Sequence, residues 1–197
     1  MRHDELGVLR GDVLIHVGDM FDLFAREPDD LARVDDWFGR QQFDLILCIA
    51  GNHDRPLERP RSGRTSPFRN VIYLEDERIE HKGVTFYGSP WVPDLPGHAF
   101  HAPADVLRQK WAAIPEGTDV LITHTPPAGI LDQSSRGQSL GCQSLADAVE
   151  QICPRLHCFG HVHASGGSVK SGATTYVNAA SLHRADGPLR RPKRFRI

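Results

Sequence analysis

The sequence predicts an α/β fold in which two mixed β-sheets pack face to face and helices cover their outer sides. Apolar runs of strand length in the first half alternate with a segment of helical period, which is typical of parallel βαβ layers. The second half adds short strands with little helix between them, which indicates a further sheet. The chain has 197 residues, of which 40% are hydrophobic. That length suits one domain with a sizeable core and not two, so residues 1–197 are treated as a single domain.

A strand-helix-strand unit opens the chain. Residues 13–17 form an apolar run bounded by Gly18 and Asp19, and residues 43–50 form a second apolar run. Between them, residues 29–41 have the apolar spacing of an amphipathic helix. Such a unit builds a parallel layer whose loops leave the carboxyl ends of the strands.

The strands that follow are short and bounded by turns. Residues 71–74, 78–81 and 84–87 are expected to form a meander. Residues 166–170 and 174–178 predict a hairpin that turns at a Ser-Gly pair between them. Two more strands and two helices are expected at residues 120–122, 156–159, 103–113 and 143–152.

Composition and charge narrow the class of protein. Twenty-three Lys and Arg residues against 25 Asp and Glu residues leave a formal charge of -2, so neither nucleic acid nor an anionic membrane is an expected partner. Residues 184–197 form a candidate basic tail, which suits contact with RNA, a solvated tail, or an edge strand guarded by arginine. The start resembles no signal peptide, no run approaches the roughly 20 apolar residues of a membrane span, and four irregularly spaced cysteines suit reduced thiols. A cytoplasmic protein is expected.

Polar side chains follow four of the predicted strands. Asp19 offers a short carboxylate, and Asn52 offers a neutral carbonyl oxygen. His124 and His161 offer imidazole nitrogens that suit Zn, Fe or Mn. Each residue alone is more typical of a turn, a helix cap or a structural histidine. The set predicts a metal site with four ligands at a common rim of the sheets.

A second metal position begins beside the first. His163 lies two residues after His161, so on an extended backbone both rings face the same side, and Asp19 could bridge two ions. Two ions about 3.5 to 4 Å apart would clamp a phosphoryl group and generate a bridging hydroxide. His53 could give a proton to the leaving oxygen, with Asp22 or Asp54 to orient its ring. The alternative is that His53 caps a turn.

The loop at residues 55–69 is rich in Pro, Arg, Ser and Gly, which is typical of a solvated connector and compatible with a loop that faces a substrate. The loop at residues 93–101 carries His98 and His101. These two histidines invite interpretation as metal ligands, but we favour packing in the loop, because the principal set already has its ligands.

The motifs together resemble the calcineurin-like metallophosphoesterase superfamily. They are Gly-Asp-x-x-Asp at 18–22, Gly-Asn-His-Asp at 51–54, Thr-His-Thr-Pro-Pro at 123–127 and Gly-His-Val-His at 160–163. Within that superfamily, the strings at 14–19, 87–91, 114–119 and 176–179 resemble the metallophosphoesterase-domain-containing subfamily. The likeness spans roughly residues 3–181.

The resemblance implies an αββα sandwich with two divalent metal ions, Mn, Fe or Zn. It implies phosphomonoesterase or phosphodiesterase activity on a small phosphate ester, with nucleotides among the candidates. It assigns Asp19 as the bridge and His163 to one metal, and His53 as the catalytic histidine. It assigns Asn52, His124 and His161 to the other metal.

One part of the superfamily pattern has no counterpart. The pattern opens with a strand that ends in Asp-x-His and supplies two ligands to the first metal. The residues before Gly18 contain no such motif. The chain is expected to begin just after that strand, so that the first metal keeps only Asp19 and His163. The leading hypothesis is a metal-dependent phosphoesterase. The alternatives are a degenerate metal- or nucleotide-binding scaffold that binds one ion, and a metal-dependent amide or C–O hydrolase.

Overall fold

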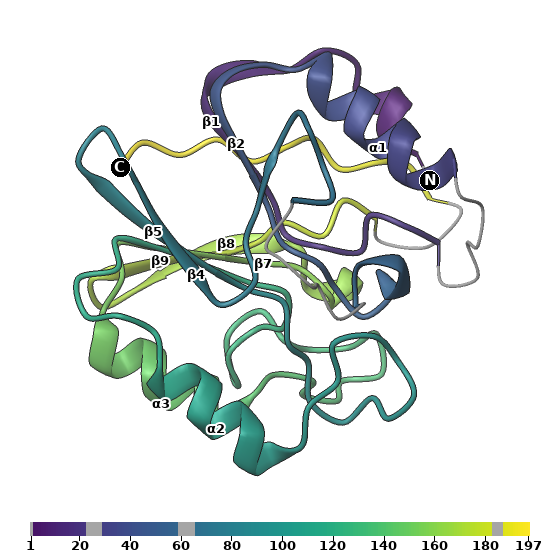
Figure 1. The fold of residues 1–197 in the computed structure, drawn as a ribbon. Helices are drawn as coiled ribbons and strands as arrows, with labels where there is room; N and C mark the ends of the chain where they lie inside the picture. The colour runs from purple at the N-terminus through teal and green to yellow at the C-terminus, as the bar shows by residue number, and fades with distance from the viewer. Residues whose placement is uncertain (1, 23–28, 59–65, 183–186) are drawn as a thin grey trace.

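The structure of the chain, a computed structural model, describes residues 2–22, 29–58, 66–182 and 187–197. Its described strands form two sheets that lie one against the other, with helices outside (Figure 1). The first sheet has three parallel strands in the order β1-β2-β3. Their bounds are Arg10–His16, Gln42–Cys48 and Ile72–Tyr73.

The second sheet has six strands in the order β4-β5-β6-β7-β9-β8. Its four inner strands run parallel, and β4 and β8 are antiparallel at the two edges. In chain order the strands are Glu77–His81, Val84–Ser89, Val120–Thr123, Leu156–Phe159, Gly167–Ser171 and Thr174–Asn178. The mixed α/β sandwich predicted from the sequence is confirmed.

Helices cover the outer faces of both sheets because each has one apolar stripe. On α1, Asp29–Gly39, the buried apolar side chains are Val34, Trp37 and Phe38. On α3, Gln143–Ile152, they include Leu145 and Val149, which are four residues apart. Spacings of three and four place side chains on one helix face. Helix α2, Ala104–Ala112, lies beside α3 below the second sheet (Figure 1).

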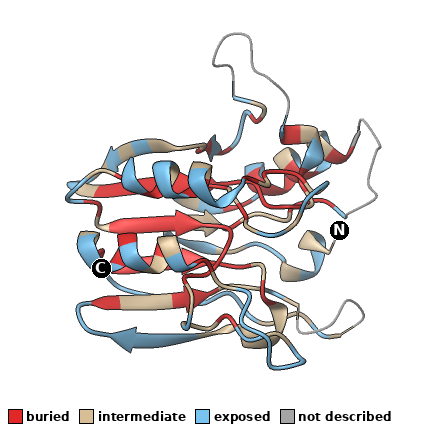
Figure 2. Cartoon of the chain, turned by 90° about the horizontal axis from the view of Figure 1, so that it is seen from below, coloured by how far each residue is buried: buried red, intermediate tan, exposed pale blue. Residues whose placement is uncertain are grey.

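The core has three apolar clusters, one on each side of the first sheet and one beneath the second. The cluster between the sheets includes Leu47 and Ile49 from the first sheet and Val120 and Ile122 from the second. Figure 2 shows the strands there as the most deeply buried part of the chain. Full burial of such a side chain contributes roughly 1.5 to 3 kcal/mol, so the inner cluster is what holds the sheets together.

The meander expected at residues 71–87 was wrong in its first strand. Strand β3 pairs in parallel with β2 in the first sheet, and only β4 and β5 form a hairpin in the second. The chain crosses between sheets after Leu74, whose N–H donates to the carbonyl of Cys48 at 2.8 Å. Asp76, with a φ of 56°, then turns the backbone into β4. Leu74 is fully buried between the layers, and this burial favours the crossing.

Several other predicted elements lie where they were expected, and two predicted segments lie partly outside the described residues. The hairpin of β8 and β9 and the helices α2 and α3 lie where they were predicted. Of the loop 55–69, residues 59–65 lie outside the described residues, as do residues 184–186 of the basic tail. Residues 191–197 are exposed and lie in neither helix nor strand. All four cysteines are free thiols, and none of the described helices has the length and apolar character to cross a bilayer.

Candidate metal centre

The loop after β1 turns sharply and returns the Asp19 carboxylate to the end of the sheet. Gly18 has a φ of 93°, and a Cβ there would lie 2.5 Å from the carbonyl oxygen of Ala50. Only glycine tolerates both conditions. Asp19 also has a positive φ, 55°, a conformation that costs energy in a residue with a side chain and is common at functional sites.

The loop after β2 packs directly beneath that carboxylate. A Cβ on Gly51 would lie 2.4 Å from His124 Cε1 and 2.5 Å from Asp19 Oδ1. The backbone N–H of His53 donates to Asp19 Oδ1 at 3.0 Å. Gly51 is therefore a site residue that the motif contained and that sequence reasoning passed over, because its contribution is the absence of a side chain.

Asp54 joins the two loops from below. It is fully buried, and its two oxygens accept hydrogen bonds from the N–H groups of Gly51, at 2.7 Å, and Phe21, at 3.0 Å. Burial and the nearby Asp19 charge raise the pKa of Asp54 to about 7. Asp54 is one of the two carboxylates proposed to orient the His53 ring. Both of its oxygens instead accept hydrogen bonds from backbone N–H groups of the two loops.

The loop after β6 brings in His124 with a fixed tautomer. Its Nδ1 lies 2.7 Å from the carbonyl oxygen of Val17, which can only accept, so Nδ1 carries the proton and Nε2 presents a lone pair. Nε2 lies 3.1 Å from Asn52 Oδ1 and 3.3 Å from Asp19 Oδ2. Three acceptor atoms therefore converge on one point.

The loop after β7 completes the group. His161 has a φ of 64°, and its Nδ1 lies 2.9 Å from Asn52 Oδ1. Ligand atoms of Asp19, His124 and His161 all lie within 4.8 Å of one another. Two of the predicted ligands follow strands of the first sheet and two follow strands of the second, so the rim predicted from the motifs is formed by both sheets.

The charges of the group favour a cation. Burial alone would lower the pKa of His124, but the Asp19 carboxylate outweighs it and the pKa is raised. Burial would raise the pKa of Asp19, yet His124 and the His53 N–H hold it well below its usual range. Burial, with the charge of His124, lowers the pKa of His161 to about 3. The group thus attracts one positive charge, and its nitrogen and oxygen donors fit Mn, Fe or Zn.

The other predicted site residues lie around this group. His163 begins a short 3-10 turn, His163–Ser165, and is half-buried. Burial lowers the pKa of His163, while the charge of Asp19 acts in the opposite direction. It lies outside the cluster of three ligands found among the described residues. The His163 carbonyl accepts a hydrogen bond from Arg190 at 2.8 Å.

Asp22 and His53 are the two predicted catalytic residues. His53 is half-buried in the loop beside Asp19, and Asp22 is exposed at the end of the first loop. The charge of Asp22 acts on His3, which lies near the same end of β1. The proposed pairing of Asp22 with the His53 ring stays a prediction.

His98 is a residue that the sequence assigned to loop packing. Its Nδ1 lies 3.2 Å from the amide nitrogen of Asn52. The neighbouring His101 instead forms a bridge with Val92. No periodic pattern in this loop distinguished the two histidines, so contact with a ligand residue could be found only from the structure.

Comparison with known proteins defines the class. A sequence model of the family described as Calcineurin-like phosphoesterase matches residues 3–165. The chain belongs to this family, whose members are in general metal-dependent phosphoesterases. The superfamily resemblance drawn from the four motifs is thereby confirmed.

Particular relatives agree with the subfamily. The chain is 36% identical to the human Metallophosphoesterase domain-containing protein 1, over 91% of this chain and 62% of that protein. It is 37% identical to the UPF0046 protein K07C11.7 of Caenorhabditis elegans, over 95% of this chain and 68% of that one. The chain thus spans less than two thirds of the length of the human relative. The solved structure of TT1561 from Thermus thermophilus has the same fold, with a TM-score of 0.60, 15% identity, and coverage of 92% of this chain and 81% of that chain.

Proposed function

We propose that the chain hydrolyses phosphodiesters or nucleotide phosphates in a metal-dependent reaction. The observation that carries this proposal is the convergence of Asp19 Oδ2, Asn52 Oδ1 and His124 Nε2 on one point, which are oxygen and nitrogen atoms of the kinds that bind divalent metal ions. The group attracts positive charge, because the Asp19 carboxylate raises the pKa of His124 despite its burial. Divalent ions bound there would supply Lewis acidity to a phosphoryl oxygen and activate water.

The residues divide into holding and proton-transfer roles. Asp19, Asn52, His124 and His161 would hold one ion, and Asp19 and His163 would contribute ligands to a second. The backbone N–H of His53 donates to Asp19 Oδ1, which supports a place for this residue beside the metal ligands, and its ring would give a proton to the leaving oxygen. Asp22 is the proposed partner of that ring. The substrate is a small phosphate ester in the cytoplasm.

The second candidate is a metal- or nucleotide-binding scaffold with little turnover. It is favoured by one observation: among the described residues, the ligand atoms assemble around a single position, and His163 lies outside it. Metal analysis separates the two candidates. Close to two ions per chain supports the enzyme, and about one ion with negligible turnover supports the scaffold.

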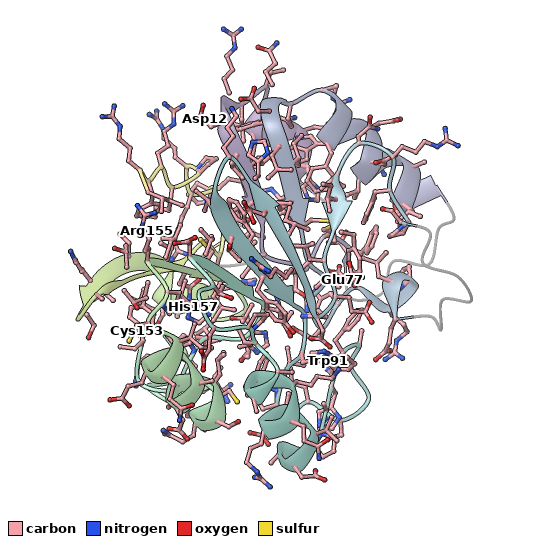
Figure 3. All side chains as sticks on the ribbon, turned by 60° about the vertical axis from the view of Figure 1, so that its left-hand side comes forward. Asp12, Glu77, Trp91, Cys153, Arg155 and His157 are labelled. Carbon is pink, nitrogen blue, oxygen red and sulfur yellow. The ribbon has the colours of Figure 1, made fainter. Side chains whose placement is uncertain are left out.

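The direct test is hydrolysis of bis-p-nitrophenyl phosphate by the full chain in Mn2+. We expect turnover in the wild type and its loss in Asp19→Ala and His124→Ala. Asp12→Ala, at an exposed position on β1 (Figure 3), is the matched control and should keep full activity. Equal rates in the site variants and the control would refute the assignment.

A further inference from the structure

The amide of Asn52 can face the candidate metal centre in two ways. As the structure has it, Oδ1 points at His124 Nε2 and His161 Nδ1. A half-turn of the amide would present its NH2 group instead, which can donate to the lone pair of His124 but cannot bind a cation. A hydrogen-bond acceptor on the other side of the amide would favour the first orientation over the second.

His98 is the group on the other side of that amide. Asn52 Nδ2 can only donate, so His98 Nδ1, at 3.2 Å, accepts the bond and His98 carries its own proton on Nε2. This bond keeps the NH2 group away from the centre and the carbonyl oxygen toward it. Asn52 is 4% exposed, so water cannot easily replace His98 as the acceptor.

The loop that carries His98 is fastened to the loop that carries Asn52. The N–H of Ala99 donates to the backbone carbonyl of Asn52 at 3.1 Å. The N–H of Phe100 donates to Glu58 Oε1 at 2.7 Å, and the Arg55 guanidinium donates to the carbonyl of Gly97. These three contacts leave the His98 ring little freedom relative to the amide.

The same loop is anchored on its far side. The ring of Phe100 packs edge-on against Trp91, with centroids 5.7 Å apart. Trp91 Nε1 donates to Asp76 Oδ2 at 2.9 Å, and Lys110 Nζ reaches the same oxygen at 2.6 Å. Figure 3 shows Trp91 near helix α2, which carries Lys110. The ion pair thus ties the loop to a helix of the second sheet.

From this geometry we infer that His98 is a positioning residue, which sets the orientation of the Asn52 amide so that its oxygen is the metal ligand. The inference rests on the proposed function, because it assigns Asn52 to the metal. Partners of metal ligands typically change metal affinity by about 10- to 100-fold when they are removed. His98 acts on the ion only through Asn52.

The test is calorimetric titration of Mn2+ into the chelator-treated full chain. His98→Leu removes the acceptor, and we expect its Kd for Mn2+ to rise by about 10- to 100-fold. His98→Asn places an oxygen near the position of Nδ1 and should recover affinity to within a few-fold. His101→Leu, in the same loop but paired with Val92, should bind as the wild type does.

A second background separates orientation from packing. Asn52→Asp has two equivalent oxygens, so no choice of orientation remains for His98 to make. In the Asn52→Asp protein, His98→Leu should change the Kd for Mn2+ much less than it does in the wild type. If His98 only packs, His98→Leu should raise the Kd by the same factor in both proteins. Thermal unfolding followed by circular dichroism checks that each variant folds.

The outcomes distinguish this inference from the function on which it rests. Unchanged Mn2+ affinity in His98→Leu, with a wild type that binds Mn2+, overturns the role of His98 and leaves the proposed function intact. A wild type that binds Mn2+ but hydrolyses no phosphodiester overturns the function, while a weakened His98→Leu still supports the positioning role. A wild type that binds no Mn2+ overturns both.

Discussion

Gly51 lies where the side chains of Asp19 and His124 meet, and a methyl group there would overlap both. We expect Gly51→Ala to push the two ligands apart, to raise the Kd for Mn2+ by at least about tenfold and to cost about 1 to 3 kcal/mol of stability through overpacking. Calorimetry and urea unfolding measure the two effects. Gly167→Ala is the control, because a Cβ there has no contact closer than 3.8 Å. Equal affinities in the two variants would contradict the prediction.

The role of His53 predicts a dependence on the leaving group. If its ring gives a proton to the leaving oxygen, His53→Gln should slow hydrolysis of a phosphodiester with an alkoxide leaving group by about 100- to 10,000-fold. A p-nitrophenolate leaving group needs little protonation and should be affected far less. Measured kcat values for both substrates test this. A uniform loss with both leaving groups would remove His53 from proton transfer.

At the residue scale, the motifs were enough to predict which side chains lie together, while their role as metal ligands stays a prediction. Asp19, Asn52, His124 and His161 each follow a parallel strand, so the topology alone brings them to a common rim. His98 was assigned to packing in its loop, and its contact with Asn52 could not be inferred because the loop has no periodic pattern. Asp54 was offered as a partner of His53, but no motif could reveal that its oxygens bind backbone N–H groups on two loops.

At the scale of elements, β7 carries a buried histidine that makes the fold sensitive to acid. Its neighbours Leu156 and Cys158 face the inner cluster, so His157 faces the helices, as Figure 3 shows. Thr123 Oγ1 donates to the carbonyl of Thr125, so His157 Nε2 donates to Thr123 at 2.8 Å. His157 Nδ1 has no partner among the described residues. Burial lowers the pKa of His157 to about 3.

The sign of the pH effect follows from that pKa. The unfolded chain binds the proton below about pH 6.5 and the folded chain does not, so stability is lost as the pH falls from there toward 3. Between pH 6 and pH 4, the free energy of unfolding should therefore fall by about 2 to 3 kcal/mol less in His157→Phe than in the wild type. Urea unfolding at several pH values measures the slopes. Parallel slopes for the two proteins would contradict the prediction.

Elements were predicted best where they are long and periodic. Helix α3 has buried side chains at helical spacing, and the prediction matched its bounds. Strand β3, Ile72–Tyr73, is too short to carry a period, and its place beside β2 depends on the burial of Leu74 between the sheets. Local sequence does not encode such a crossing, because the partner strand lies about two dozen residues earlier in the chain.

At the scale of the whole molecule, metal binding should add to the free energy of unfolding. At a free Mn2+ concentration about 100-fold above the Kd, the gain is about 2.7 kcal/mol. For a chain of this size, that corresponds to a rise in Tm of roughly 5 to 11 °C. Thermal unfolding in Mn2+ and in chelator measures it, with Asp19→Ala as the variant that should show no rise. An equal Tm in both buffers would argue against a metal held by the native state.

The four proposed ligands come from both sheets, and His124 contacts the backbone of Val17 across 107 positions of sequence. Closing such long loops costs chain entropy, so we expect these contacts to form late in folding. An ion held by all four ligands would therefore be absent from the transition state for folding, and its binding energy would act almost wholly on the unfolding rate. Metal supply would then determine how long each folded molecule survives, while the speed of its formation would stay the same.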